Sequence, residues 1–160
     1  MKKHIIISLL FLSVGLSQNQ RNEYLVDNLI EMDNGLWTVK FSDEPISGKV
    51  YGYFGKESNP KKVYTGNLRN GKKEGNWKSY HYNTGKKSYE GTFKDGKEDG
   101  LIIKWYENGQ KWIEGTSKDG KRDGLWTFWY VNGQKMYEYI YKDGILISEK
   151  EWNYDGSVKE

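Results

Sequence analysis

Short segments of aromatic and apolar residues with a few polar ones recur between residues 64 and 156, with glycine-containing turns between them. The segments are rich in Trp, Tyr, Ile and Thr, which favour β-strands. Asn-Gly or Asp-Gly dipeptides follow one another at intervals of 25, 24 and 24 residues, at Asn70-Gly71, Asp95-Gly96, Asp119-Gly120 and Asp143-Gly144. Such dipeptides are typical of type I′ turns, whose two central residues both have positive φ. The pattern therefore predicts tight antiparallel hairpins.

A second series of glycines falls between these dipeptides, at Gly85, Gly109, Gly133 and Gly156. Each period then contains two turns and two strands, and units align over residues 75–99, 100–123 and 124–144, with Thr84 as an insertion inside a turn. Strands joined by tight turns run antiparallel, and a repeated unit of this kind buries its apolar side against its neighbours. We expect an all-β fold of tandem β-hairpin repeats that form an elongated antiparallel meander or an open β-solenoid.

Each unit has two aromatic positions, counted from its leading glycine. The position two residues after that glycine holds Trp77, Ile102 and Trp126, and the position five residues after it holds Tyr80, Trp105 and Trp129. These positions have opposite parity, so in a flat strand their side chains face opposite sides of the sheet. Either both faces carry aromatic residues, or a β-bulge after the leading glycine brings them to one face.

The second strand of a unit has a glycine in its middle, at Gly91 and Gly115, where the last unit has Tyr139. Glycine weakens a strand, but it leaves room that a neighbouring ring can cover. We expect a ring such as Trp105 or Trp126 to lie over these glycines.

The pattern G-x-W-x-x-Y-x-x-N-G-x(4)-E-G-x-x-K-D-G resembles the MORN repeat, specifically the bacterial variant often labelled as an antitoxin component of toxin/antitoxin pairs. The match is clearest over residues 64–144, and residues 35–54 look like a leading, atypical unit. Ile102, Ser117 and Tyr139 depart from the pattern. The resemblance implies repeated hairpins in an elongated sheet, a binding or scaffolding role, and peripheral association with lipid at the cell envelope.

The first residues, MKKHIIISLLFLSVGLSQ, place two lysines before a run of apolar and small residues from Ile5 to Leu16. This pattern predicts a secretory signal peptide over residues 1–17, cleaved after Ser17. The run is shorter than the roughly 20 residues of a membrane-spanning helix, so we expect no transmembrane span after cleavage. The protein is then exported to the periplasm, the cell envelope or the exterior. Cysteine is absent from the sequence, which leaves no disulfide to stabilise an exported fold.

The remaining chain divides into an N-terminal capping segment with a degenerate repeat, residues 18–63, and a repeat domain, residues 64–160. Open sheet edges invite aggregation, and repeat proteins protect them with atypical terminal units. The last strand is expected to form a charged C-terminal cap, with Trp152 and Tyr154 among Glu149, Lys150, Glu151, Lys159 and Glu160.

Charge argues against a nucleic-acid partner. Removing Lys2 and Lys3 from the 25 basic residues leaves 23 against 22 acidic residues, a net charge of +1. Basic and acidic residues alternate, whereas neutralisation of phosphates needs a basic patch. Near neutrality also weakens attraction to anionic lipid.

Residues suited to catalysis or cofactor binding are few. After signal cleavage His81 is the single histidine, and nucleophile, phosphate-binding and zinc motifs are missing. The recurring carboxylates Glu90, Glu114 and Glu138 share one environment, whereas a catalytic pair needs two different ones. We expect cross-strand pairing of these carboxylates with lysine. Asp95, Asp99, Asp119 and Asp123 lack the spacing of a calcium loop. The sequence predicts no enzyme activity, no metal and no cofactor.

Aromatic residues are the strongest candidates for binding, because a thin sheet cannot hide them all and exposed rings stack on sugars, peptides or other apolar groups. The candidate set is Trp77, Tyr80, Trp105, Tyr106, Trp126, Trp129 and Tyr130, within a wider series that includes Trp112 and Phe128. The main hypothesis is a binding or scaffold module for a protein or polysaccharide partner at the cell envelope. The alternatives are a glycan-binding or cell-wall-binding repeat protein and a carboxylate-dependent glycan hydrolase.

Overall fold

The computed structural model describes residues 23–40, 42–55 and 59–159. The expected signal peptide lies outside these residues. The described chain is built almost entirely of β-strands, with one short 3-10 helix, η1 (Val26–Asn28). The strands are β1 (Glu23–Leu25), β2 (Leu29–Glu31), β3 (Trp37–Val39), β4 (Gly48–Phe54), β5 (Lys61–Arg69), β6 (Lys72–Tyr80), β7 (Lys87–Lys94), β8 (Lys97–Trp105), β9 (Lys111–Lys118), β10 (Lys121–Arg122), β11 (Gly124–Trp129), β12 (Lys135–Lys142) and β13 (Ile145–Glu151).

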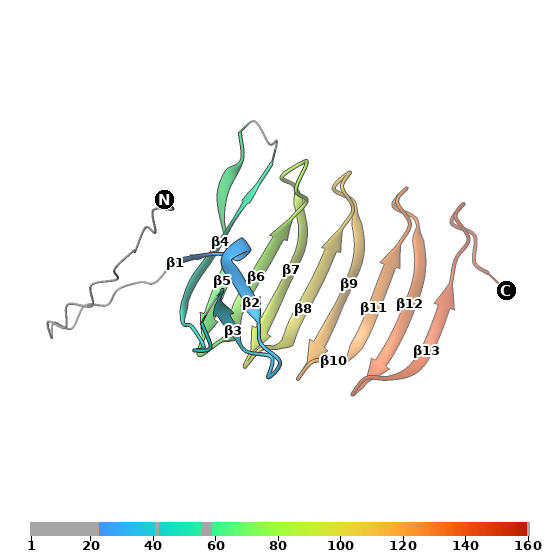
Figure 1. Ribbon diagram of the computed structural model, residues 1–160. Helices are drawn as coiled ribbons and strands as arrows, with labels where there is room; N and C mark the ends of the chain where they lie inside the picture. The colour runs from blue at the N-terminus through green and yellow to red at the C-terminus, as the bar shows by residue number, and fades with distance from the viewer. Residues whose placement is uncertain (1–22, 41, 56–58, 160) are drawn as a thin grey trace, which may run out of the picture.

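One open sheet contains every strand except β2 and β3, in the order β1-β4-β5-β6-β7-β8-β9-β11-β12-β13, with β10 also paired to β9 (Figure 1). From β4 onward the pairs along this order are antiparallel, and β1 joins β4 in parallel. The predicted all-β meander of tandem hairpins is confirmed. The pairing begins upstream of the expected repeat domain, since residue 64 falls inside β5.

The two turn series have different geometries. Asp95 has a φ of 49° and Gly96 a φ of 84°, as a type I′ turn requires, and the same holds at Asn70-Gly71, Asp119-Gly120 and Asp143-Gly144. In the second series only the glycine is left-handed, as at Gly109 with a φ of 94°. The amide of Gly109 donates to the carbonyl of Tyr106 (2.9 Å), which describes a type I turn followed by a left-handed residue.

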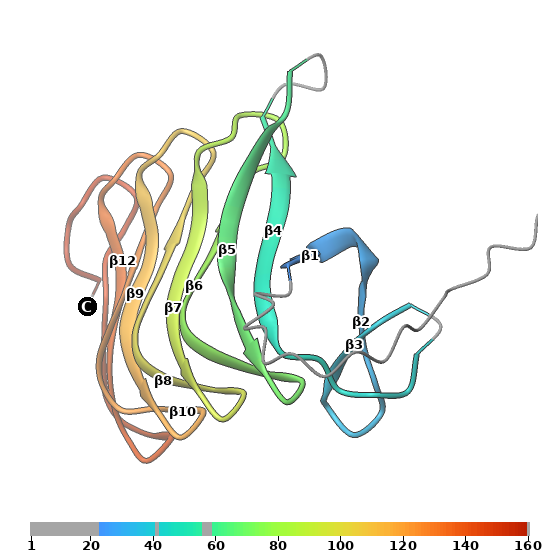
Figure 2. The same cartoon turned by 90° about the vertical axis from the view of Figure 1, so that its left-hand side faces the viewer.

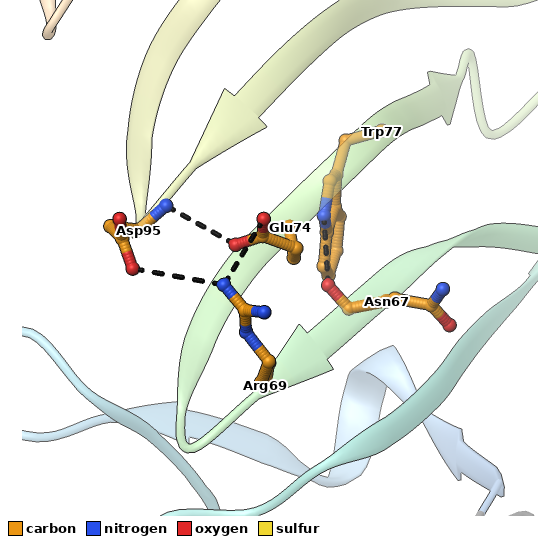
Figure 3. A network of polar contacts seen from close by, with 5 residues as sticks. All are labelled: Asn67, Arg69, Glu74, Trp77 and Asp95. Atoms are coloured by element: carbon orange, nitrogen blue, oxygen red, sulfur yellow. Dashed lines mark hydrogen bonds and ion pairs between the residues drawn. The ribbon is translucent and has the colours of Figure 1, made fainter.

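Adjacent type I′ turns are tied together by carboxylates. The amide of Asp95 donates to Oε2 of Glu74 (3.2 Å), and Arg69 bridges Glu74 (3.3 Å) and Asp95 (3.9 Å) (Figure 3). Two hairpins further on, Asp123 accepts from the amide of Asp143 (3.2 Å). That hydrogen bond, with help from Lys142, holds the pKa of Asp123 below its usual value. These carboxylates therefore connect one hairpin to the next.

Large side chains lie over the mid-strand glycines. A Cβ atom on Gly115 would overlap the indole of Trp126, whose Nε1 donates to the carbonyl of Thr116 (2.9 Å). Trp77 covers Gly66 in the same way and donates to the carbonyl of Asn67 (3.1 Å), as Figure 3 shows. The prediction that Trp126 covers a glycine is confirmed.

The corresponding prediction for Trp105 is wrong. Ile102 stands opposite both Gly91 and Gly115, and its Cδ1 and the hydroxyl of Tyr89 occupy the space above Gly91. Ile102 is too short to cover the glycine as an indole does, and Tyr89, on the same strand as Gly91, fills the remainder.

The N-terminal residues define an inner face of the sheet. Leu29 packs with Val50, Leu68 and Trp77 in a buried cluster, with Trp37 against it. Figure 2 shows η1, β2 and β3 on the concave side of the bowed strands, over the first part of the sheet. We call this side the inner face and the opposite side the outer face. Trp77, Ile102 and Trp126 all belong to the inner face, because paired residues in register share a side.

Lys73 joins this cluster. Its ammonium lies over the rings of Trp37 (5.2 Å), Trp77 (5.1 Å) and Phe93 (5.1 Å). Burial lowers the pKa of Lys73, and the attraction of a cation to ring faces offsets part of that desolvation. The capping residues thus join the repeat through an enclosed cation as well as through apolar contacts.

The question of one aromatic face or two is settled by the pairing. Bulges leave Ser88, Trp112 and Met136 unpaired on the return strands, and the second aromatic position stays on the outer face. Trp105 there lies against Lys87, which pairs with Glu90. Aromatic residues therefore occupy both faces.

The C-terminal edge is only partly protected. The amide of Lys159 donates to the carbonyl of Glu151 (3.0 Å), so the last residues cover the end of β13. The start of β13 has exposed apolar side chains, with Ile145 68% and Ile147 63% exposed. Of the charged residues expected to cap the sheet, Glu149, Lys150 and Glu151 lie in the second half of β13, Lys159 follows the strand, and Glu160 lies outside the described residues.

Replacement of Gly115 by alanine is expected to destabilise the protein by about 1–3 kcal/mol, because the new methyl group overpacks against the fixed base of the Trp126 indole. Chemical denaturation measures the loss. Gly91→Ala is the matched control: its methyl meets the far ends of Tyr89 and Ile102, which can move aside, so the loss is smaller. Equal losses in the two variants would contradict this packing.

Candidate functional site

A cation lies against an indole on the outer face in successive hairpins. Nζ of Lys87 is 2.7 Å from Glu90 and 4.9 Å from the centre of the Trp105 ring. Glu90 and Lys87 belong to one hairpin and Trp105 to the next, so the contact joins neighbouring units. A lysine in this position shields one side of the ring and leaves its charge at the surface.

The arrangement repeats along the sheet. Lys111 pairs with Glu114 and lies 5.9 Å from the Trp129 ring, and Lys135 pairs with Glu138 and lies 5.4 Å from the Trp152 ring. We call this set the outer ladder: Trp105, Trp129 and Trp152, with Lys87, Lys111, Lys135, Glu90, Glu114 and Glu138. Equivalent rings are two strands apart, which corresponds to about 10 Å.

The expected cross-strand pairing of the glutamates needs a correction. Glu90 does pair across strands with Lys78 (3.6 Å), but the shorter contact in every unit is with the lysine three residues earlier on the same strand. The bulge between the two residues explains this, since it leaves one intervening side chain unpaired and shortens the distance between its neighbours. The hydrogen bond from Lys87 holds the pKa of Glu90 below its usual value.

A pocket of about 320 Å³ lies at the end of the sheet that carries the second turn series. Its lining comes from two neighbouring hairpins and consists of His81, Ser88, Trp105, Tyr106, Glu107 and Trp112. We call it the aromatic pocket. Trp112 is the bulged residue of β9 and is 42% exposed, and its ring lies 5.8 Å from that of Tyr106 at an angle of 35°. The two rings form an open wall of the pocket.

Hydrogen bonds between hairpins hold the pocket in place. The hydroxyl of Tyr106 donates to the carbonyl of Trp129 (2.7 Å), and burial raises the pKa of this tyrosine, so it stays a donor. In the preceding hairpin His81 takes the same role, with Nε2 2.9 Å from the carbonyl of Trp105. A carbonyl only accepts, so Nε2 donates this hydrogen bond and Nδ1 is left for another partner. That atom lies 4.0 Å from Oε1 of Glu107.

The pocket gathers residues that break the repeat. His81 stands where the next two units have Tyr106 and Tyr130, Glu107 where the next unit has Val131, and Trp112 where the neighbours have Ser88 and Met136. Residues that only pack the sheet can recur in every unit. His81, Glu107 and Trp112 instead differ from their counterparts in other units, and all three lie around one pocket on adjacent hairpins. This favours a specific role for the pocket.

The structure divides the predicted binding residues into two groups. Trp77 and Trp126 are 8% and 4% exposed and belong to the core of the inner face, so they leave the candidate set. Tyr80, Trp105, Tyr106, Trp129 and Tyr130 are half-buried. Trp105 and Tyr106 line the aromatic pocket, Trp129 belongs to the outer ladder, and Tyr80 packs against Phe54 at 5.1 Å. Sequence reasoning did not select His81 or Glu107, although comparison of the units could have found both.

A larger cavity of about 530 Å³ lies near the C-terminal edge, lined by Tyr137, Tyr139, Glu149, Lys150, Glu151 and Lys159. Its two glutamates are the residue type that a carboxylate-dependent hydrolase needs. Glu151 is ion-paired with Lys159 at 2.7 Å, and Glu149 is exposed. A general acid is kept protonated by an apolar enclosure, which neither glutamate has, so this arrangement does not favour hydrolysis.

Two other classes of site were searched for within the described ranges. No group of three or more His, Cys, Asp and Glu side chains there could hold a metal ion. Among these same residues no helix has the length and apolar character needed to cross a membrane.

Comparison with known proteins identifies no relative: no family model, curated protein or solved structure matches the chain. The resemblance to MORN repeats therefore stays a prediction from the sequence.

Replacement of Lys87 by glutamine is expected to raise the pKa of Glu90, because the hydrogen bond that lowers it most is lost. A depressed carboxyl pKa stabilises the fold above the unfolded pKa, and this contribution disappears as the pH falls through the folded pKa. The variant should therefore lose less stability on acidification. A carboxyl-carbon NMR titration measures the pKa directly, with Lys104→Gln, near Tyr89 on the inner face, as the control. An unchanged Glu90 pKa in Lys87→Gln would refute the role of this lysine.

Proposed function

We propose that the protein is a non-enzymatic binding module that presents its outer face to an extended partner, a polysaccharide or a protein, at the cell envelope. The observation that carries the proposal is the outer ladder, in which half-buried indoles recur with a lysine and a glutamate beside each. Their spacing of about 10 Å offers equivalent contacts to successive parts of a long ligand.

The exposure of the outer face supports the proposal. Among the described residues, β2, β3 and η1 pack on the inner face at the first strands, on the side of the sheet opposite to the outer ladder (Figure 2). Apolar side chains on the outer face of the sheet add to this surface, with Leu101 50%, Leu125 52% and Ile140 47% exposed. Exposed apolar surface rimmed by charge is typical of interaction sites.

The chemistry of the ladder favours binding over catalysis. Each glutamate is paired with a lysine in the same way, so no carboxylate of the ladder differs from its counterparts as an acid and a base must. Tryptophan, the aromatic residue of the ladder, is among the residue types that dominate binding energy at interfaces.

Export and kinship complete the proposal. The apolar run from Ile5 to Leu16 after two lysines supports a signal peptide, and hence a partner in the periplasm, envelope or exterior. The recurring K-D-G turns and aromatic positions support kinship with the bacterial MORN variant. Both parts rest on the sequence.

Replacement of Trp129 by alanine is expected to weaken binding of the purified protein to an insoluble cell-envelope fraction by about tenfold, because one indole of the ladder is lost. Co-sedimentation measures the bound fraction. Trp129→Tyr copies Tyr80 of the first unit and should weaken binding less. Because it keeps an aromatic ring at this position, comparison of the two variants separates loss of binding from loss of fold.

Val131→Ala serves as the control, because Val131 is 50% exposed and lies outside the ladder. Digestion of the envelope fraction with protease or with glycan-degrading enzymes separates the two partner classes. If the folded Trp129→Ala protein co-sediments as well as the unaltered one, the ladder is not the binding surface.

A further inference from the structure

We infer that the aromatic pocket binds one uncharged pyranose ring of a polysaccharide. The inference rests on the proposed binding function and deepens it, since it names the chemical class of ligand and a site separate from most of the outer ladder.

The wall of the pocket suits the apolar side of a sugar. Trp112 and Tyr106 stand with their ring centres 5.8 Å apart and tilted by 35°, and Trp112 is 42% exposed. The flat C–H side of a pyranose stacks on such rings, as other apolar groups with a planar side do. Trp112 is the extra, unpaired residue of the β9 bulge. A bulge re-aims such a side chain, which regular backbone pairing would otherwise hold in register with the neighbouring strand.

The polar groups of the pocket suit a ligand with hydroxyl groups. Nε2 of His81 is engaged with the carbonyl of Trp105 at 2.9 Å, which leaves Nδ1 as the free nitrogen of the ring. Nδ1 lies 4.0 Å from Oε1 of Glu107, whose carboxylate accepts hydrogen bonds. A hydroxyl both donates and accepts, so adjacent hydroxyls of a sugar can bond to the carboxylate and to Nδ1 in either of its roles, and the glutamate side chain, 63% exposed, can adjust to them.

A neighbouring lysine argues against a cationic ligand. Nζ of Lys86 donates to the carbonyl of Asn108 at 3.1 Å, and Nζ of Lys87 lies 4.9 Å from the Trp105 ring. Lys87 is already paired with Glu90, so Lys86, held beside the residue that follows Glu107, is the positive charge that disfavours an ammonium group between the rings. The Glu107 carboxylate disfavours an acidic sugar for the same reason. A purely apolar side chain offers no hydrogen bond to the Glu107 carboxylate or to Nδ1 of His81, which opposes its binding.

The site occurs once among the described hairpins. Between the next two units Tyr106 stands in the place of His81, Val131 in the place of Glu107 and Met136 in the place of Trp112. The expected stoichiometry is one sugar ring per chain in this pocket, even on a polymer that contacts several units.

The test is an NMR titration of the purified protein with cellotriose, chitotriose, maltotriose and laminaritriose, monitored at the tryptophan Nε1–H signals. At least one trisaccharide is expected to bind with one-to-one stoichiometry and to shift the Trp112 signal. Trp112→Met and Glu107→Val copy the next unit, so they should keep the fold and weaken binding about tenfold each. Met136→Ala, at the equivalent bulge, should leave binding unchanged.

Two results would overturn the inference: no trisaccharide shifts the Trp112 signal, or Trp112→Met binds as the unaltered protein does. The proposed function is tested separately by co-sedimentation with the envelope fraction. If that binding persists and depends on Trp129 while no trisaccharide binds, the sugar site is refuted and the binding module stands. If a trisaccharide binds and co-sedimentation is independent of Trp129, the sugar site is supported and the outer ladder is refuted as the binding surface.

Discussion

Contact between a large side chain and a glycine on the adjoining strand is the interaction on which this structure depends. Trp126 over Gly115 and Trp77 over Gly66 each combine close apolar contact with a hydrogen bond from the indole to a backbone carbonyl. The glycine admits the ring to the surface of the sheet, and the ring covers backbone that the glycine leaves bare. A chain without cysteine thereby obtains buried apolar area from a single layer of strands.

Because the large side chains that cover glycines pack on the inner face, the outer face holds a different set of contacts. Lysines there lie between a glutamate of their own hairpin and an indole of the next, so each unit is joined to its neighbour through charge as well as backbone pairing. The rings are shielded on one side but not buried, which leaves aromatic surface exposed. The aromatic pocket adds a local departure to this regular surface, formed where His81, Glu107 and Trp112 replace the residues of other units.

Much of the fold could be predicted, because its signals are local. The φ values at Asp95-Gly96 and its equivalents follow from the two residues themselves, and regular turns then impose antiparallel strands. Contacts between units were harder. The bulges at Ser88, Trp112 and Met136 have no sequence signature, and they decide that each glutamate meets the lysine on its own strand. The packing over Gly91 was equally hard to predict. Ile102 is too short to cover this glycine alone, and Tyr89 covers the rest of it. For the site, exposed aromatics were predictable as a class, but buried Trp77 and half-buried Trp105 differ only through their side of the sheet.

The proton chemical shifts of the Gly115 methylene test the central packing most directly. Protons held against the face of an aromatic ring are shifted upfield by its ring current. The Gly115 Hα signals should therefore lie well upfield of those of Gly124, which has no atom of a non-neighbouring residue within 4 Å of its added Cβ position. Gly115 signals at ordinary glycine positions would mean that Trp126 does not cover this strand, and the account of the fold would be contradicted.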